Sequence, residues 1–457
     1  MLPWGHFEST PGLRRIAHCL LPLVLGTGAT LVLLLLASEP ARPAYAGTLT
    51  FPGCAATIQG CINIANPGDT ILISAGDYTE SLTLNKAVSL TGALSSTTIL
   101  HALPNTRVLT VTGAAVDSSA VISGLTFTGG LVTGTQTCPD SCGGAILITG
   151  GAQPLLSNLQ LSGNTAGFDG GGIYASGAII LTAGRFIGNS AYGGGGLYTA
   201  GAVTVTNSSF VNNRATGLVS QGGGLATFDT AMLAGTQFVS NTASLGGGLY
   251  VGGAATLVGA SFVGNTAAAG GGIYAPPVPI TVLLVTGSSF VSNTATNTGG
   301  GLDAEGTVIV TTSSFLSNTA GSIGGGLEAG NSASLGVLVS DTQFINNSGG
   351  GAEISSRSTV ISSSFVSNIG GGLIANGGGT VISSSFISNL YGGGLYAVGA
   401  VTVTASSFLS NTGNVSGRSH SARPPSCEAQ RPTATIASTW SRPLNGCSNP
   451  SVKLMCE

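Results

Sequence analysis

The sequence predicts an all-β solenoid, a parallel β-helix in which roughly 14 coils of about 25 residues stack along one axis. Three observations predict this fold. The motif Phe-x-x-Asn occurs ten times between Phe186 and Phe408. The start of a glycine triplet precedes each phenylalanine, by sixteen residues in eight coils and by twenty in the other two. Between the two motifs, apolar and polar residues alternate, as in the stretch 203–206 (Val-Thr-Val-Thr), and a period of two is typical of strands.

The composition agrees with stacked coils. Glycine accounts for 74 of 457 residues, and only 6% of residues are charged. Stacking near-identical coils about 4.8 Å apart brings like residues together, so charges would repel each other while phenylalanine rings would form an internal stack. We expect the asparagines to bond along the stack at a tight turn, because asparagine tolerates left-handed backbone. The segment between each asparagine and the next glycines varies in length, which predicts a surface loop.

The amino-terminal residues 1–46 have the features of a signal peptide. Arg14 and Arg15 precede an almost wholly apolar stretch, 19–37, and residues 44–46 (Ala-Tyr-Ala) form a cleavage pattern before Gly47. The alternative is an uncleaved membrane anchor, since about 19 apolar residues nearly span a bilayer. No second hydrophobic span follows, so we expect no membrane span in the mature chain.

The first coil differs from the others and predicts a short amphipathic capping helix. Ile58, Cys61, Ile62 and Ala65 fall on one helical face, and the sequence 67–69 (Pro-Gly-Asp) ends the helix before strands begin at Thr70. Solenoids need such a cap because the end coil otherwise leaves its core open.

Export permits disulfides, and two close cysteine pairs are candidates. Cys54 and Cys61 lie seven residues apart, and Cys138 and Cys142 lie four apart. Local disulfides are the favoured interpretation and free thiols are the alternative. Neither pair has the additional cysteines or histidines that a zinc site needs.

The repeats 47–413 resemble known families. The stretch 67–92, PGDTILISAGDYTESLTLNKAVSLTG, resembles the first coils of pectin-lyase-like right-handed parallel β-helix proteins. The combination of Gly-Gly-Gly-[Ile/Leu] with Phe-x-x-Asn resembles the repeats of chlamydial polymorphic outer membrane proteins, over about Thr57 to Asn411. The resemblance implies a right-handed solenoid that is exported, often to the cell surface, and often adhesive.

The carboxyl-terminal segment 414–457 departs from that family and from the repeat. Only 44 residues follow Gly413, too few for the membrane barrel that the family uses for autotransport, so we do not expect autotransport. The segment is rich in proline and charge, and it leaves the repeat abruptly. We expect an irregular tail, produced by truncation or by an out-of-frame reading; the alternative is a natural disordered linker.

One column of residues, two positions past each glycine triplet, is a candidate functional face. If the preceding Ile or Leu points inward, the column points outward. It contains four tyrosines in two pairs and then three consecutive acids: Tyr174, Tyr198, Tyr250, Tyr274, Asp303, Glu328 and Glu353. Stacked carboxylates repel unless a cation, a proton or water separates them. The sharper hypothesis is a cation site, with calcium as the candidate, or a carbohydrate face with tyrosine platforms. The alternative is a solvated strand face with ordinary variation.

Catalytic patterns are absent from the sequence. His101 is the only histidine between Gly47 and Gly413, no serine elbow is present, and no Gly-Lys-Ser/Thr follows the glycine runs. We therefore nominate no catalytic residue, and beyond the calcium hypothesis we expect no cofactor. The formal net charge of −3 also argues against nucleic acid as a partner.

These observations favour an exported, non-catalytic repeat protein, an adhesin or surface scaffold that binds glycans or proteins. A secreted or outer-membrane-associated location follows from the same prediction. The alternative function is a carbohydrate-active enzyme, a polysaccharide lyase or hydrolase on a pectin-lyase-like fold. The sequence identifies neither the ligand nor the oligomeric state.

Overall fold

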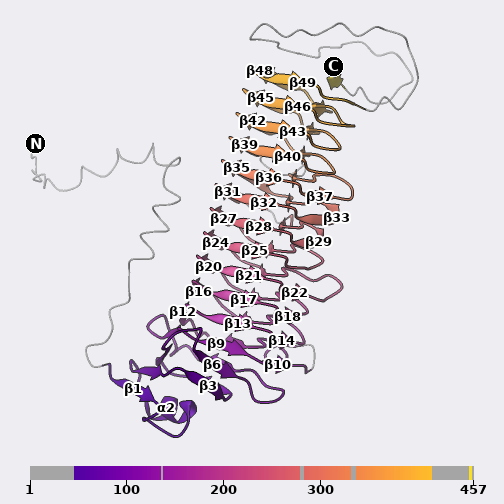
Figure 1. Ribbon diagram of the computed structural model, residues 1–457. Helices are drawn as coiled ribbons and strands as arrows, with labels where there is room; N and C mark the ends of the chain where they lie inside the picture. The colour runs from indigo at the N-terminus through magenta and orange to yellow at the C-terminus, as the bar shows by residue number, and fades with distance from the viewer. Residues whose placement is uncertain (1–45, 135–136, 278–281, 331–335, 414–451, 455–457) are drawn as a thin grey trace, which may run out of the picture. The chain divides into compact units, whose positions relative to one another are not determined.

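The computed structural model describes residues 46–134, 137–277, 282–330, 336–413 and 452–454 (Figure 1). The chain divides into two units, Met1–Pro40 and Ala41–Glu457, and every described residue belongs to the second. The predicted signal peptide lies outside the described residues except for Ala46. The predicted tail 414–457 also lies outside them, apart from a short strand at 452–454.

The second unit is a right-handed parallel β-helix, as the sequence predicts. Three long sheets, with 15, 14 and 14 strands, run along it, and successive coils add one strand to each sheet in turn (Figure 1). Sheet 1 consists of β1 (Thr48–Phe51), β2 (Thr70–Ile73), β5 (Ser89–Gly92), β8 (Val121–Ser123), β12 (Leu155–Ser157), β16 (Ile179–Thr182), β20 (Val203–Thr206), β24 (Ala231–Ala234), β27 (Ala255–Val258), β31 (Val282–Thr286), β35 (Thr307–Thr311), β39 (Val337–Ser340), β42 (Ser358–Ile361), β45 (Gly379–Ile382) and β48 (Val401–Thr404).

Sheet 2 contains the phenylalanine positions, and sheet 3 contains the candidate column. Sheet 2 consists of β3 (Gly76–Thr79), β6 (Thr98–His101), β9 (Thr126–Thr128), β13 (Gln160–Ser162), β17 (Arg185–Ile187), β21 (Ser209–Val211), β25 (Gln237–Val239), β28 (Ser261–Val263), β32 (Ser289–Val291), β36 (Ser314–Leu316), β40 (Gln343–Ile345), β43 (Ser364–Val366), β46 (Ser385–Ile387) and β49 (Ser407–Leu409). Sheet 3 consists of β4 (Leu82–Leu84), β7 (Leu109–Thr112), β11 (Ile146–Thr149), β15 (Ile173–Ala175), β19 (Leu197–Thr199), β23 (Leu225–Thr227), β26 (Leu249–Val251), β30 (Ile273–Ala275), β34 (Leu302–Ala304), β38 (Leu327–Ala329), β41 (Ala352–Ile354), β44 (Leu373–Ala375), β47 (Leu395–Ala397) and the antiparallel β50 (Val452–Leu454).

The segments predicted to be surface loops are partly strands. Where they follow sheet 2, they form two small parallel sheets of their own. These are β10 (Leu131–Val132), β14 (Thr165–Ala166), β18 (Ser190–Ala191) and β22 (Arg214–Ala215), and then β29 (Thr266–Ala269), β33 (Thr294–Thr298) and β37 (Thr319–Ala320). The loop prediction is wrong there, because even a variable segment pairs with its neighbour when consecutive coils keep similar lengths.

The phenylalanines form the predicted internal stack. From Phe186 to Phe408 each ring lies over the next, with ring centroids 4.5 to 5.0 Å apart. The rings from Phe186 to Phe386 are fully buried. Every coil therefore covers the apolar face of its neighbour, which explains why the motif recurs.

The asparagines form a buried ladder beside this stack. In each step, the side-chain amide Nδ2 donates to Oδ1 of the asparagine one coil further. It also donates to a backbone carbonyl of the preceding coil, which belongs to Phe186 for Asn213 and to Leu161 for Asn189. The expected left-handed backbone belongs to a different residue. The residue before each ladder asparagine has positive φ, for example Asn212 at 55° and Ser240 at 54°. The ladder asparagine is selected by its bonds between coils, and not by a left-handed backbone.

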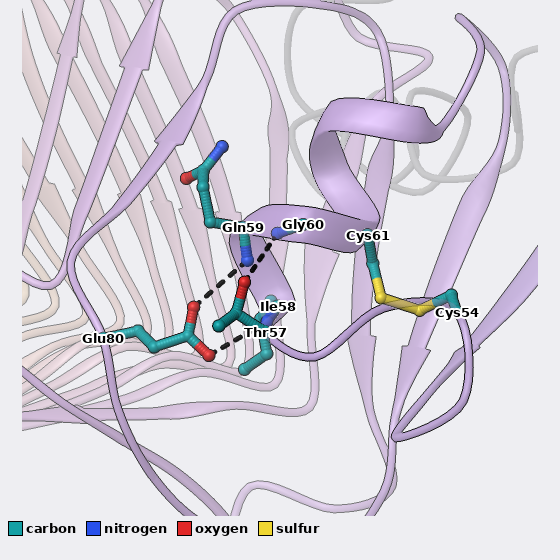
Figure 2. The surroundings of a disulfide bond; sticks show 7 residues. All are labelled: Cys54, Thr57, Ile58, Gln59, Gly60, Cys61 and Glu80. Atoms are coloured by element: carbon teal, nitrogen blue, oxygen red, sulfur yellow. Dashed lines mark hydrogen bonds between the residues drawn. A yellow bond between two sulfur atoms is a disulfide. The ribbon is translucent and has the colours of Figure 1, made fainter.

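The predicted capping helix is α2 (Ile58–Ile64), whose Ile58, Cys61 and Ile62 are buried. Thr57 Oγ1 accepts from Gly60 N, and the Glu80 carboxylate accepts from the N–H groups of Ile58 and Gln59 (Figure 2). The Cys54–Cys61 disulfide ties this helix to the segment before it (Figure 2). The expectation that strands begin at Thr70 is wrong, since β1 precedes the helix and pairs in parallel with β2.

Candidate ligand-binding cleft

In sheet 3, members of the candidate column lie opposite one another on neighbouring strands. Tyr174 pairs with Tyr198, Tyr250 with Tyr274, Tyr274 with Asp303, and the acids follow one another on successive coils. The residue before each member is buried in the core, as for Ile273 and Leu302. Alternation along each strand therefore directs the column side chains away from the core.

The tyrosines belong to a longer ladder of five aromatic rings. Tyr174 and Tyr198 stack with centroids 5.5 Å apart, and Tyr250 and Tyr274 stack at 5.9 Å. Ala226 leaves a gap between the pairs, and the ring of Phe228 fills it, 5.8 Å from Tyr198 and 5.1 Å from Tyr250. Rings that stack on each other cover each other's faces, so most of this ladder offers ring edges and not flat platforms for a sugar.

The ladder ends at an open cleft of about 410 Å³. The cleft forms where the column changes from a large ring, Tyr274, to the short side chain of Asp303 on the next coil. It is lined by Ala269, Tyr274, Thr298, Asp303, Glu305, Glu328, Gly330 and Ser355. No Lys, Arg or His is among these lining residues.

Two of the three acids are buried and Glu328 is partly buried, so the column is not an ordinary solvated face at these positions. Asp303 is 3% exposed and Glu353 is 8% exposed. Thr298 Oγ1 donates a hydrogen bond of 2.5 Å to Asp303 Oδ2, and Asn376 Nδ2 donates one of 2.9 Å to Glu353 Oε1. Glu353 Oε2 is buried and has no hydrogen-bond partner among the described residues.

Burial and mutual repulsion favour the protonated forms of these acids. Burial, the charge of Asp303 and a hydrogen bond with it raise the pKa of Glu328 to about 9. Burial also raises the pKa of Asp303, although hydrogen bonds from Thr298 and Glu328 oppose the rise. Near neutral pH the Glu328 carboxyl group is therefore protonated, and its proton relieves the repulsion within the stacked acids without a cation.

The acids could also hold a metal ion, since carboxylate oxygens suit Ca²⁺. Glu353 Oε2 offers one free oxygen, but binding at the Asp303–Glu328 pair would first have to displace the proton on Glu328. The calcium hypothesis therefore stays a prediction.

Both cysteine pairs form disulfides, Cys54–Cys61 in the cap and Cys138–Cys142 in a loop before β11. His101 lies on the surface, with Nε2 3.4 Å from Asp77 Oδ1. Within the described residues, no helix is long and apolar enough to cross a membrane.

The sequence pattern misses several residues that contact the column or line the cleft. Phe228, Thr298, Glu305 and Asn376 lie outside the column, and only the folded coil brings them to it. Thr298 does carry a sequence signal, because it lies directly before a glycine triplet of the repeat. Phe228 carries no repeat signal at all.

No family model matches the chain, and no curated protein matches it. Solved structures do resemble it. The catalytic unit of a thermostable GH87 alpha-1,3-glucanase from Streptomyces thermodiastaticus strain HF3-3 is 15% identical, with 83% of this chain and 71% of that chain covered and a TM-score of 0.48. The Dettilon tailspike protein is 12% identical over 78% of this chain and 68% of that chain, with a TM-score of 0.41. The pectin methylesterase PemA from Erwinia chrysanthemi is 15% identical over 55% of this chain and 80% of that chain, with a TM-score of 0.33. At these identities the likeness concerns the β-helix fold alone.

Proposed function

We propose that this protein is an exported β-helix that binds glycan chains, acting as a surface adhesin or scaffold without catalysis. The observation that carries the proposal is the open cleft beside Tyr274, lined by carboxyl and hydroxyl groups. Sugar recognition combines an apolar ring face with a few polar groups that fix the hydroxyls. The resemblance to polymorphic outer membrane proteins, which remains a prediction, would agree with a surface location.

The lining chemistry selects among glycans. The partly exposed carboxyl group of Glu305 can accept hydrogen bonds from sugar hydroxyls, while Thr298 and Ser355 both donate and accept. Tyr274 is the last ring of the ladder, so its face toward Asp303 is not covered by another aromatic ring. Because the lining has acids and no basic residue, uronates and sulfated sugars would be repelled. We therefore propose that the ligand is a polymer of neutral sugars or amino sugars.

Binding of the full chain to immobilised neutral, amino and uronate polysaccharides tests this proposal. We expect neutral or amino-sugar polymers to bind and uronates to fail. Tyr274→Ala should weaken binding about tenfold, the loss expected when a contact worth about 1.4 kcal/mol is removed. Tyr396→Ala is the matched control, since Tyr396 occupies the same column three coils beyond Glu328. Equal binding of all polymers, or equal loss in both variants, would contradict the proposal. Repeating the assay with calcium and with a chelator tests the calcium hypothesis.

A glycoside hydrolase is the second candidate, favoured by the protonated Glu328 beside a second carboxyl group, that of Asp303. A protonated acid and a carboxylate are the groups that glycoside hydrolysis uses. However, hydrolases place these two groups on either side of the bond that they cleave, and Asp303, at 3% exposed, leaves its carboxyl group little access to a sugar. Release of reducing ends from a bound polymer, abolished by Glu328→Gln without loss of binding, would favour the hydrolase.

A further inference from the structure

A buried acid lies against the second disulfide, at the opposite end of the aromatic ladder from the cleft. Sheet 3 pairs Ile146 with Ile173, and Gly143 N donates to Asp169 O, so Asp169 follows Cys142 one coil further along the axis. A carboxylate oxygen of Asp169 and the Sγ atoms of Cys138 and Cys142 all lie within 4.8 Å of one another. Among the described residues, this is the only such group of three.

Structural stability does not explain this acid. Asp169 is 7% exposed, and no basic side chain of the described residues forms an ion pair with it. A neutral N–H, that of Gly193, is the group that favours its charged form. A Cβ at position 193 would lie only 2.7 Å from Asp169 Oδ1, so the glycine leaves room for the carboxyl group. Burying a carboxylate without an ionic partner costs stability, and an asparagine would avoid that cost.

The two sulfurs differ in access. Cys142 is fully buried, whereas Cys138 is partly exposed in the loop. Arg107 Nη2 holds this loop by donating to the carbonyl oxygens of Pro139 and Asp140, at 2.8 and 3.0 Å. An incoming thiolate therefore reaches Cys138 Sγ, and Cys142 Sγ is the leaving group. A thiolate left in a buried site is unstable unless it receives a proton.

We propose that the Cys138–Cys142 disulfide is a thiol–disulfide exchange site for dithiols, in which Asp169 gives the departing Cys142 sulfur its proton. A substrate thiolate attacks Cys138 Sγ, the S–S bond breaks, and a mixed disulfide forms on Cys138. Asp169 passes its proton to Cys142 Sγ and becomes a carboxylate. The second substrate thiol then attacks the mixed disulfide and releases Cys138. The substrate is oxidised to its disulfide, the two cysteines are reduced, and the two substrate protons end on the cysteines once Asp169 is reprotonated by solvent.

The protonation of Asp169 agrees with this role. Burial raises the pKa of Asp169 to about 7, so both of its forms are populated near neutral pH. The ionisable groups around it are the phenols of Tyr174 and Tyr198, whose own pKa values are raised chiefly by burial and further by Asp169. Arg107 and Asp140 are the charged groups of the disulfide loop. Below pH 7, Asp169 is increasingly the acid that the leaving sulfur needs.

The molecule contains its own control, the Cys54–Cys61 disulfide, for which no carboxylate is found within the same reach among the described residues. The test exposes the full chain to dithiothreitol for timed intervals, quenches with N-ethylmaleimide, and maps both cysteine pairs by mass spectrometry. Rates are divided by the concentration of reagent thiolate at each pH. We expect Cys138–Cys142 to open at least about tenfold faster than Cys54–Cys61. This rate difference is smaller than the rate enhancements that general acid catalysis typically gives.

Asp169→Asn should slow the opening of Cys138–Cys142 about tenfold or more at pH 6.5 and leave Cys54–Cys61 unchanged. Asp140→Asn, inside the same loop, is the matched control and should keep the original rate. In the unmodified protein the normalised rate should fall as pH rises through about 7, a readout that needs no variant. Equal rates for the two disulfides, a flat normalised profile, or an Asp169→Asn variant that reacts as fast as the unmodified protein would each overturn the proposal.

Discussion

Removal of one ladder asparagine should destabilise the coils around it far more than removal of an exposed one. Asn265 is fully buried, and its Oδ1 accepts from Asn241 N at 2.9 Å and from Asn241 Nδ2 at 3.0 Å. Its Nδ2 donates to Phe238 O and to Asn293 Oδ1, both at 2.9 Å. Asn265→Ala deletes all four hydrogen bonds and leaves the buried Asn241 N–H without its partner.

The magnitude follows from these contacts. An orphaned buried N–H costs about 1–3 kcal/mol and each of the other lost bonds costs about 0.5–1.5 kcal/mol, so we expect a loss of roughly 4 kcal/mol. Two of the groups at the other ends of those bonds keep a second hydrogen bond: Asn241 Nδ2 donates to Phe210 O, and Asn293 Oδ1 accepts from the backbone N–H of residue 265.

A solenoid transmits such a loss mainly to neighbouring coils, so the measurement must be local. Hydrogen exchange followed by mass spectrometry should show faster exchange in β25 and β28, and little change in β5 or β8. Asn297→Ala is the control, because Asn297 is exposed. A difference below about 1 kcal/mol between the two variants would refute the view that the ladder holds the coils together.

Three further predictions concern the stack, the acids and the cap. Phe290→Ala should cost about 4 kcal/mol in the same exchange measurement, because its ring packs between Phe262 at 5.0 Å and Phe315 at 4.5 Å, whereas the exposed Phe228→Ala should cost much less. Glu328 holds its proton in the folded protein from its ordinary pKa of 4.5 up to about 9, so the folded state binds more protons and stability falls as pH rises through that interval. Melting temperatures of Glu328→Gln should therefore decline less between pH 5 and pH 9 than those of the unmodified protein or of the exposed-site control Asp229→Asn. Parallel curves would contradict the raised pKa of Glu328. Replacing Cys54 and Cys61 by alanine should lower stability by about 2 kcal/mol and raise exchange in α2 and β2, and unchanged exchange there would show that the disulfide does not fasten the cap.

The sequence by itself determined the parts of this protein that repeat. The spacing from glycine triplet to phenylalanine sets the coil, because residues at equal positions in stacked coils must meet, and a core stack and a polar ladder follow from that rule. The order of the candidate column could be read for the same reason: Tyr274, Asp303 and Glu328 are neighbours in space because they occupy the same position in consecutive coils.

The tertiary structure alone decided what does not repeat. Phe228 enters the ring ladder from outside the column, since Ala226 leaves space that only the folded coil defines. Asp303 and Glu353 are buried, and their partners come from places that the column does not indicate: Thr298 precedes Asp303 in the same coil, and Asn376 lies one coil beyond Glu353. Cys142 and Asp169 are 27 positions apart, and nothing in the local sequence of either residue links them. The carboxyl group of Asp169 reaches the Cys138–Cys142 disulfide because the coil between them has the length that stacks the two residues. Periodicity predicts which positions meet, but burial and protonation depend on every side chain around them.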